Sequence, residues 1–154
     1  MAIPGETCVS DFDPATKHFK LSEWNSKHPK AKPYPIEWIE DRWRPLAEML
    51  DAIRDEMGEA IEITPNGGYR CAEHNAAMGG AHNSQHMQGR AADIKCPSGA
   101  KLLHYTIKKM QKEGRLRRLG GLGNYAHFVH VDIRAKGERG ELATWEGKRS
   151  AENA

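Results

Sequence analysis

The sequence predicts an α+β fold in which a small, mainly antiparallel sheet is backed by helices. Two long stretches show the 3.6-residue periodicity of helices, several short stretches have the branched or alternating residues of strands, and glycine-rich turns separate them. The order is helix, strand, loop, strand, helix, loop, strand, without an internal repeat. At 154 residues the chain has room for one domain with one core.

The distribution of apolar residues divides this domain into three regions. Residues 1–34 are rich in proline, lysine and polar residues, and we expect an irregular arm with a short turn at KLSEW. Residues 35–137 contain the periodic segments and are predicted to form the core. Residues 138–154 are polar and contain glycine, so we expect a tail with one apolar cluster at LATW.

The first helix is predicted to begin after Pro35. Apolar residues recur three or four positions apart from Ile36 to Met57, which is typical of an amphipathic helix. Pro35 suits the first turn, and Gly58 suits the position just past the end. Pro45 has no amide hydrogen, so we expect a kink or two abutting helices there.

The remaining elements are shorter. EAIEIT is predicted to be a strand that ends in the turn PNGG, and YRCAEHNAAM a short helix. RAADIK is a second strand, and SGAKLLHYTIKKMQKEG is a helix for which Ser98 is a possible cap. GGLGN is expected to be a flexible loop before HFVHVDIR, the clearest strand.

Composition argues against two classes of function. The chain has 23 Lys and Arg against 21 Asp and Glu, a net charge of +2, which is far from the basic excess of a nucleic-acid binder. No run approaches the ~18 apolar residues of a membrane span. The amino-terminal segment lacks a basic start followed by an apolar stretch, so we expect no secretory signal.

The cysteines do not show the pattern of a disulfide-rich protein or of a cysteine zinc site. There are three, Cys8, Cys71 and Cys96, without a C-x-x-C spacing, so neither a set of disulfides nor an all-cysteine zinc site is expected. A bridge between Cys71 and Cys96 stays open beside the alternative of two unpaired thiols.

The stretch SQHMQGRAAD has the residues of a metal site. His86 and Asp93 provide two ligands if the chain reverses between them, and Gly89 makes that reversal inexpensive. A catalytic zinc ion uses three protein ligands and a water molecule. The third ligand is expected from another element, and the HFVHVD strand offers His127 and His130.

These residues resemble a known family. SQHMQGRAAD matches the S-x-H-x-x-G-x-A-x-D pattern of the zinc D-alanyl-D-alanine carboxypeptidase family, which includes D-Ala-D-Ala dipeptidases and phage L-alanyl-D-glutamate endolysins. FVHVDIR is similar to the family's second zinc element, and NGGYRCAEHN is similar to its SGYR…HN segment. The resemblance runs in the right order from about Phe19 to Arg134. It implies a fold shared with hedgehog domains, with residues 35–137 as a zinc peptidase core.

The resemblance also implies roles for single residues. His86, Asp93 and His130 would bind one catalytic Zn²⁺, which lowers the pKa of a bound water molecule towards ~7. Arg70, in the GYR position, would hold the scissile carbonyl or its oxyanion, because a permanent charge binds more tightly as negative charge develops. Ser84 would line the substrate site.

The general base departs from the family pattern. Relatives place Glu in E-x-x-H or His in H-x-H before the last ligand, and here His127 and Phe128 occupy these positions. Imidazole is suited to proton transfer near neutral pH, so His127 is the predicted base. A regular strand would turn His127 and His130 to opposite faces, so the assignment requires a bulge or an irregular strand entry. His82 is the reserve candidate.

The resulting hypothesis is a zinc peptidase that cleaves an amide bond in the peptide stem of bacterial peptidoglycan. It fits a monomeric phage or prophage lysin, held in the cytoplasm until release and acting on the cell wall, with the stem peptide as partner and neither nucleic acid nor membrane. The bond is D-Ala–D-Ala or L-Ala–D-Glu. The alternative is a non-catalytic, zinc-stabilised, hedgehog-like binding module.

Two further interpretations carry less weight. A Ser84–His86–Asp93 catalytic triad is disfavoured, because there is no G-x-S-x-G elbow and the residues are crowded. The basic run KKMQKEGRLRR is interpreted as the solvated face of a helix and its exit, with attraction of an anionic wall polymer as the alternative and nucleic-acid binding as a weaker one.

Overall fold

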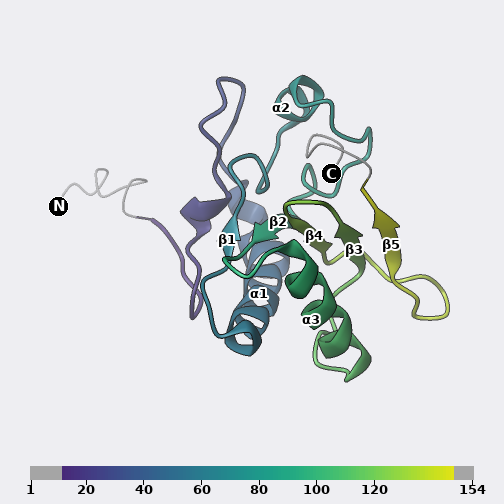
Figure 1. Ribbon diagram of the computed structural model, residues 1–154. Coiled ribbons are helices and arrows are strands. Elements are labelled where there is room, and N and C mark those ends of the chain that lie inside the picture. Colours follow the sequence, from purple (N-terminus) through teal and green to yellow (C-terminus); the bar gives the residue numbers. More distant parts are fainter. Residues whose placement is uncertain (1–11, 148–154) are drawn as a thin grey trace.

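The computed structural model describes residues 12–147, which form one sheet with helices packed on it (Figure 1). The five strands lie in the order β1-β2-β4-β3-β5. Their bounds are β1 Glu62–Ile63, β2 Ala91–Lys95, β3 Gly121–Asn124, β4 Val129–Asp132 and β5 Ala143–Glu146. All neighbours pair antiparallel except β3 and β5, which are parallel. The predicted α+β fold with a mainly antiparallel sheet is therefore confirmed.

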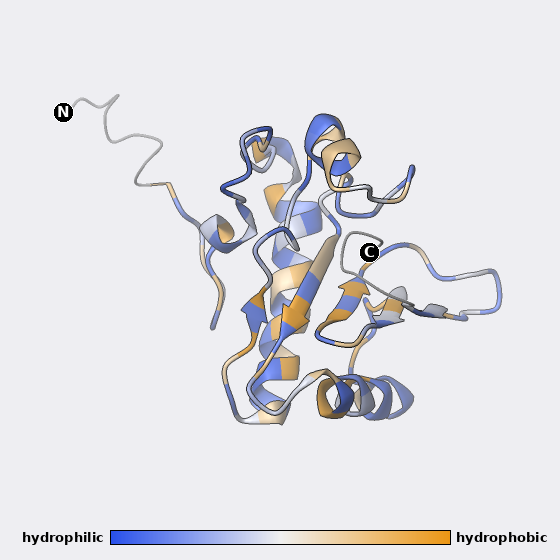
Figure 2. Ribbon diagram, turned by 45° about the horizontal axis from the view of Figure 1, so that its top comes forward, coloured by the Kyte–Doolittle hydropathy of each residue, from blue (hydrophilic) through white to orange (hydrophobic). Residues whose placement is uncertain are grey.

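Two helices form the core with the sheet. α1 (Arg44–Met57) and α3 (Ala100–Lys112) contact each other, and α3 contacts β3 and β4. Leu50 of α1 and Leu103 of α3 are fully buried, as is Val131 of β4. Figure 2 shows the apolar residues along the strands and on the helix faces turned towards them. Within the described residues, no helix is long and apolar enough to cross a membrane.

The break expected at Pro45 is present. The segment before it forms a 3₁₀ turn at Ile36–Trp38 and a π-helical turn at Ile39–Trp43, and the regular helix begins only at Arg44. Pro45 thus occupies the first turn of α1, where its missing amide hydrogen removes no helical bond. Gly58 ends the helix in the left-handed conformation, with φ of 70°.

The loop predicted at GGLGN is wrong, because this segment is strand β3. Its glycines serve close approach rather than flexibility. A Cβ atom on Gly121 would overlap the carboxylate of Asp132, and one on Gly123 would overlap the ring of Trp145. These glycines therefore allow β4 and β5 to place large side chains against β3.

The expected arm and tail both contribute to the fold. Phe19, Trp24 and Tyr34 of the arm are buried in the core, and the turn expected at KLSEW is a 3₁₀ helix, Leu21–Trp24. Ala143, Thr144 and Trp145 of the tail's LATW cluster lie in β5. Among the described residues, the segments before residue 35 and after residue 137 therefore pack against the core as well. Residues 1–11 and 148–154 lie outside the part of the chain that the structure describes.

Two smaller expectations are corrected or resolved. Ser98 does not cap α3: Gly99 precedes the helix, and Ser98 instead donates its amide and hydroxyl to Glu59 at 2.8 Å each. Cys71 and Cys96 are both free thiols, whereas Cys8 lies outside the described residues.

α2 (Ala72–Ala77) is the short helix expected in YRCAEHNAAM, and it lies beyond the sheet on the side away from α3 (Figure 1). The segment that connects β1 to α2 carries NGGYR and lies beside β2, where Thr64 donates its amide to the carbonyl of Asp93 at 2.9 Å. Asp93 donates its amide to the carbonyl of Gly67 at 2.9 Å, which joins this segment to the sheet.

Candidate metal centre

Three potential ligands meet at the centre of the sheet. One donor atom each from His86, Asp93 and His130 lie within 4.8 Å of one another, and all three side chains are buried. Asp93 of β2 stands directly opposite His130 of β4 in the antiparallel ladder, so both point to the same face. The structure thus brings together the three residues that the sequence suggests as ligands.

The turn before β2 brings His86 to this face. Gly89 has φ of 69°, which favours glycine, and it reverses the chain between His86 and Asp93. A Cβ atom at Gly89 would come within 2.8 Å of both Tyr34 and Trp38. The Tyr34 hydroxyl donates to the Gly89 carbonyl at 2.6 Å, so the turn is also anchored to the core.

The imidazole of His86 is oriented by the backbone. Its Nδ1 lies 2.9 Å from the carbonyl oxygen of Gly68, which only accepts hydrogen bonds, so Nδ1 carries the proton. Nε2 is left facing Asp93, 3.2 Å from Oδ1. Burial lowers the pKa of His86, which favours the neutral imidazole. This is the form that binds a metal ion.

His130 is oriented by a carboxylate that the sequence analysis did not use. Its Nε2 lies 2.8 Å from Oδ2 of Asp132, and its Nδ1 lies 3.0 Å from Oδ1 of Asp93. Arg134 holds Asp132 in turn, donating from Nε at 2.9 Å and from Nη2 at 2.7 Å. A carboxylate that accepts the other ring N–H of a histidine ligand fixes the orientation of the ring. It also makes the imidazole bind a metal ion more strongly. The signal was the spacing, because residues two apart in a strand share a face.

Charge within the cluster sets the protonation states of the metal-free protein: Asp93 is ionised and His86 is neutral, whereas His130 keeps a proton that a metal ion would displace. Burial alone would raise the pKa of Asp93, but His86 and His130 outweigh it and hold that pKa below its usual range. Burial alone would lower the pKa of His130, but its hydrogen bonds with Asp132 and Asp93 prevail and raise it to about 9. Two imidazoles and one carboxylate, with a fourth position left for water, match the donor set of catalytic zinc sites.

Arg70 lies beside the three ligands and is almost fully buried. Its Nε donates to the carbonyl of Asn66 at 2.9 Å, and its Nη1 donates to Oδ1 of Asn75 at 3.2 Å. Its Nη2 lies 3.7 Å from Oδ2 of Asp93. The guanidinium is thus fixed on two sides and presents its remaining positive edge to the cluster.

A cavity of about 230 Å³ opens beside His130. Its other lining residues are Ala81, Asn83, Ser84, Gln85, Arg134 and Trp145. Ser84 is thus one of the residues that line the cavity beside His130, and its predicted contact with substrate stays a prediction. Its hydroxyl also accepts the amide of His86 at 3.1 Å, whereas the ring nitrogens of His86 face Gly68 and Asp93. This arrangement provides no Ser-His-Asp triad.

Trp145 of β5 lines the cavity, and Tyr125, which follows β3, contacts it. The ring of Trp145 lies 5.0 Å from that of His130, and its Nε1 donates to the Tyr125 hydroxyl at 2.9 Å. Tyr125 stacks on Phe128 at 4.4 Å, and burial raises its pKa. Sequence reasoning placed Trp145 in the tail, because pairing between β3 and β5 has no local signal.

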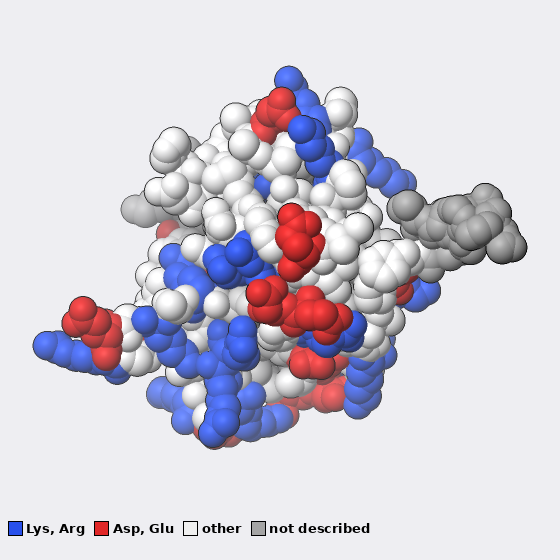
Figure 3. All heavy atoms as spheres, turned by 180° about the vertical axis from the view of Figure 1, so that it is seen from behind, with Lys and Arg blue, Asp and Glu red and all other residues white. Residues whose placement is uncertain are grey.

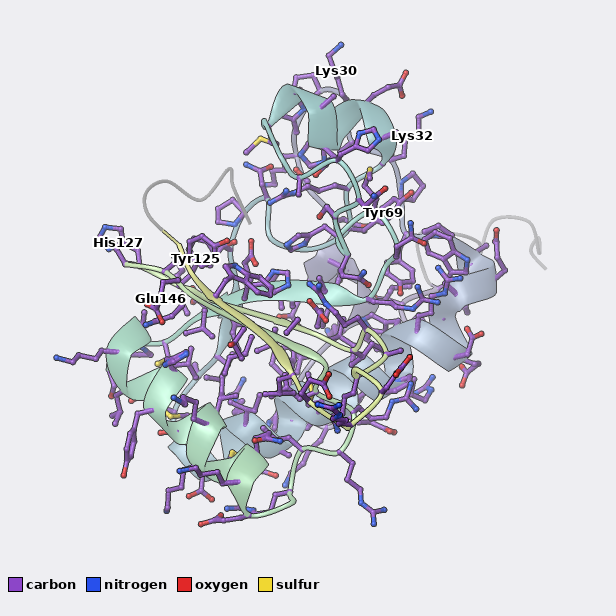
Figure 4. All side chains as sticks on the ribbon, turned by 90° about the vertical axis from the view of Figure 1, so that its right-hand side faces the viewer. Lys30, Lys32, Tyr69, Tyr125, His127 and Glu146 are labelled. Atoms are coloured by element: carbon purple, nitrogen blue, oxygen red, sulfur yellow. The ribbon has the colours of Figure 1, made fainter. Side chains whose placement is uncertain are left out.

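The predicted base is not in the cavity. His127 is exposed in the turn between β3 and β4, and Figure 4 shows its ring directed outward, beyond Tyr125 and Glu146. Neither His127 nor the exposed His82 lines the cavity beside His130. For His127 to act as the base, the turn would have to move towards the metal centre.

Comparison with known proteins places the chain in a class. A family model described as Peptidase M15 matches residues 17–132, which is most of the chain. The chain belongs to the Peptidase M15 family. It is also similar to the zinc D-Ala-D-Ala carboxypeptidase of Streptomyces albus G, with 37% identity over 73 residues. That match covers 47% of this chain and 26% of the carboxypeptidase, so it spans about a quarter of that relative.

Proposed function

We propose that the protein is a zinc-dependent peptidase that hydrolyses an amide bond in the peptide stem of bacterial peptidoglycan. Family membership supports the reaction class. The observation that carries the proposal is the buried set of His86, Asp93 and His130, in which each imidazole has its second nitrogen engaged by the protein. The name of the Streptomyces relative supports zinc as the ion and a D-Ala-containing substrate.

Each residue around the ion has a distinct task. His86, Asp93 and His130 would hold zinc, which when bound supplies a Lewis acid and an activated water molecule near neutral pH. Asp132 keeps the ring of His130 in the binding orientation. Arg70 supplies a fixed positive charge beside the site, where it stabilises negative charge that develops on the carbonyl oxygen.

We propose that the bond cut is either D-Ala–D-Ala or L-Ala–D-Glu. Both the D-Ala–D-Ala carboxypeptidase and the L-Ala–D-Glu endopeptidase reaction place a D-residue next to the scissile carbonyl or amide. A role as a phage or prophage lysin, which reaches the wall from the cytoplasm, rests on the family resemblance alone. Lysis of intact cells after intracellular expression, compared with that of a His130→Ala variant, tests this role.

The experiment for the proposal measures binding and turnover together. Purified protein is analysed for zinc stoichiometry and then incubated with peptidoglycan, while newly released amino termini are counted. Mass spectrometry of the released muropeptides identifies the bond. One zinc per chain with steady release of amino termini supports the proposal. A fully zinc-loaded protein that releases no new amino termini would contradict the proposed function.

One observation favours a second candidate, a zinc-stabilised binding module like the hedgehog domains. In the described part of the chain, no carboxylate and no imidazole besides His130 lines the cavity at the metal centre, and His127 lies outside it. A binding module would retain stoichiometric zinc and bind stem peptides without hydrolysing them. The same experiment separates the two, because only the peptidase produces new amino termini.

A further inference from the structure

A second cavity, of about 580 Å³, adjoins the cavity at the metal centre. The two share Gln85 and Arg134 as lining residues, so they lie side by side along one wall. Five basic side chains line the second cavity: Arg90, Arg117, Arg118, Arg134 and Lys136. No acidic residue lines it. We call this cavity the basic pocket.

Most of the charge in the basic pocket is not neutralised. Arg134 pairs with Asp132 at 2.7 Å. Arg90, Arg117 and Arg118 form no ion pair with any residue that the structure describes. Figure 3 shows the molecule from behind, where Lys and Arg gather on the lower left and the acidic side chains gather near the middle. Like charges held this close repel each other, so an anion in the pocket would be attracted.

The basic side chains are attached to a fixed backbone. Arg117 and Arg118 lie between Leu116 and Leu119, which are both buried in the core. Lys136 donates from Nζ to the carbonyl of Arg117 at 2.7 Å, which joins two loops across the pocket. The pocket is therefore part of the folded structure, and binding an anion there requires little ordering of the backbone.

We propose that the basic pocket binds a free carboxylate of the substrate peptide, on a residue away from the scissile bond. This inference rests on the proposed function, because it places the scissile bond in the cavity beside His130. Peptidoglycan stem peptides carry free carboxylates within the chain. Guanidinium groups bind carboxylates in bidentate geometry, so Arg117 and Arg118 are suited to this ligand.

Gln85 supports a path between the two cavities. Its side-chain oxygen is buried and accepts no hydrogen bond from the residues that the structure describes. A buried acceptor without a partner is unfavourable, and a rotation of the Gln85 side chain towards the shared wall would give this oxygen a peptide N–H as its partner. A peptide bound across Gln85 would therefore have its reacting bond at the metal centre and its carboxylate in the basic pocket.

The test uses synthetic stem pentapeptides whose internal carboxylates are free or are amidated one at a time. For one position, the zinc-loaded wild type is expected to show a kcat/KM roughly 10-fold higher with the free carboxylate, mainly through KM. The Arg117→Gln/Arg118→Gln variant should reduce this ratio to about 2 or less. Lys27→Gln/Lys101→Gln removes the same charge from exposed positions that line neither cavity, and it should keep the ratio.

Calorimetry on the metal-free, 154-residue protein measures binding of the same peptides without hydrolysis. The free carboxylate should bind roughly 10-fold more tightly to the wild type than to the double arginine variant. If the wild type and the double arginine variant cleave the peptides with the same preference for the free over the amidated carboxylate, the inference is overturned and the proposed function stands. If no peptide is cleaved, the function fails and calorimetry still decides the inference. A double variant that is impaired on intact walls but not on peptides would assign the pocket to an anionic wall polymer and overturn the inference.

Discussion

At the scale of single residues, the ring of His130 lies between two carboxylates. Asp93 faces its Nδ1, and Asp132 accepts from its Nε2. When zinc is bound, the first carboxylate would serve as a ligand and the second would orient the ring. The sequence resemblance suggests Asp93 as a ligand. The spacing of two residues between His130 and Asp132 also indicated a shared strand face, and the structure adds Arg134 as the partner that holds Asp132.

We predict that Asp132→Asn weakens zinc binding by ~10–100-fold. A neutral amide orients the imidazole of His130 less firmly than a carboxylate does, and it leaves the ring a weaker ligand for the metal ion. Competition with a chromogenic chelator measures the affinity. Asp51→Asn serves as the control, since Asp51 is also a buried carboxylate in a hydrogen-bond network but lies on α1, away from the metal centre. Equal zinc affinity of Asp132→Asn and wild type would contradict the role of Asp132.

Zinc binding should release about one proton per ion near pH 7.5, and His130 is its source. The pKa of His130 is raised to about 9 in the metal-free protein, whereas the pKa values of His86 and Asp93 are lowered. Only His130 is therefore protonated at this pH. Below pH 9 the zinc affinity should fall about 10-fold per pH unit, and above it the dependence should flatten.

Calorimetric titration of zinc in buffers with different ionisation enthalpies counts this proton directly. A release near zero at neutral pH would show that His130 is already neutral, and the charge balance described for the cluster would be wrong. His130→Gln removes the proton source and is the matching control.

His127→Ala should change kcat/KM by less than about 3-fold, because the exposed side chain contacts neither the cavity nor the ligands. The measurement is peptide hydrolysis by protein with verified zinc content. A loss of 100-fold or more in kcat with zinc retained would show instead that the turn brings His127 to the reacting atoms, as the sequence pattern suggests.

At the scale of elements, the metal centre depends on the turn that precedes β2. Gly89 has φ of 69°, and its missing side chain leaves room for Tyr34 and Trp38. Gly114 has a similar φ of 77° at the end of α3, but nothing lies within 4 Å of the Cβ position there. An alanine at Gly114 would therefore introduce backbone strain alone, whereas an alanine at Gly89 would introduce both backbone strain and steric overlap.

We predict that Gly114→Ala lowers the free energy of unfolding by about 1–2 kcal/mol, from backbone strain alone. Gly89→Ala should cost about 1–3 kcal/mol more, because the added methyl group overlaps packed rings. It should also weaken zinc binding, since His86 moves with the turn. Urea denaturation of the metal-free proteins measures both. Equal losses in the two variants would contradict the packing account of the turn.

The elements also show what sequence patterns reveal. The helices α1 and α3 and the strand β4 have strong apolar periodicity, and their positions were predicted correctly. GGLGN was misjudged because its glycines are typical of loops, whereas here they accommodate Asp132 and Trp145 from neighbouring strands. β1 comprises two residues, shorter than the alternation in EAIEIT suggested.

At the scale of the whole molecule, the metal centre joins parts of the chain that are distant in sequence. The turn after α2 supplies His86, while β2 and β4 supply the other two ligands. The meeting of His86, Asp93 and His130 could be predicted because the motif around His86 and Asp93 is local and matches a family pattern. The cavity wall at Trp145 and the basic pocket could not, since each combines segments whose meeting depends on the tertiary fold.

The central claim is that this centre hydrolyses stem peptides, and one measurement tests it most directly. Protein carrying one zinc per chain is incubated with defined stem peptides, and the rate at which new amino termini appear is recorded beside that of His130→Ala. The account predicts turnover by the zinc-loaded wild type, abolished together with zinc binding in the variant. Stoichiometric zinc in the wild type without any new amino termini would contradict it.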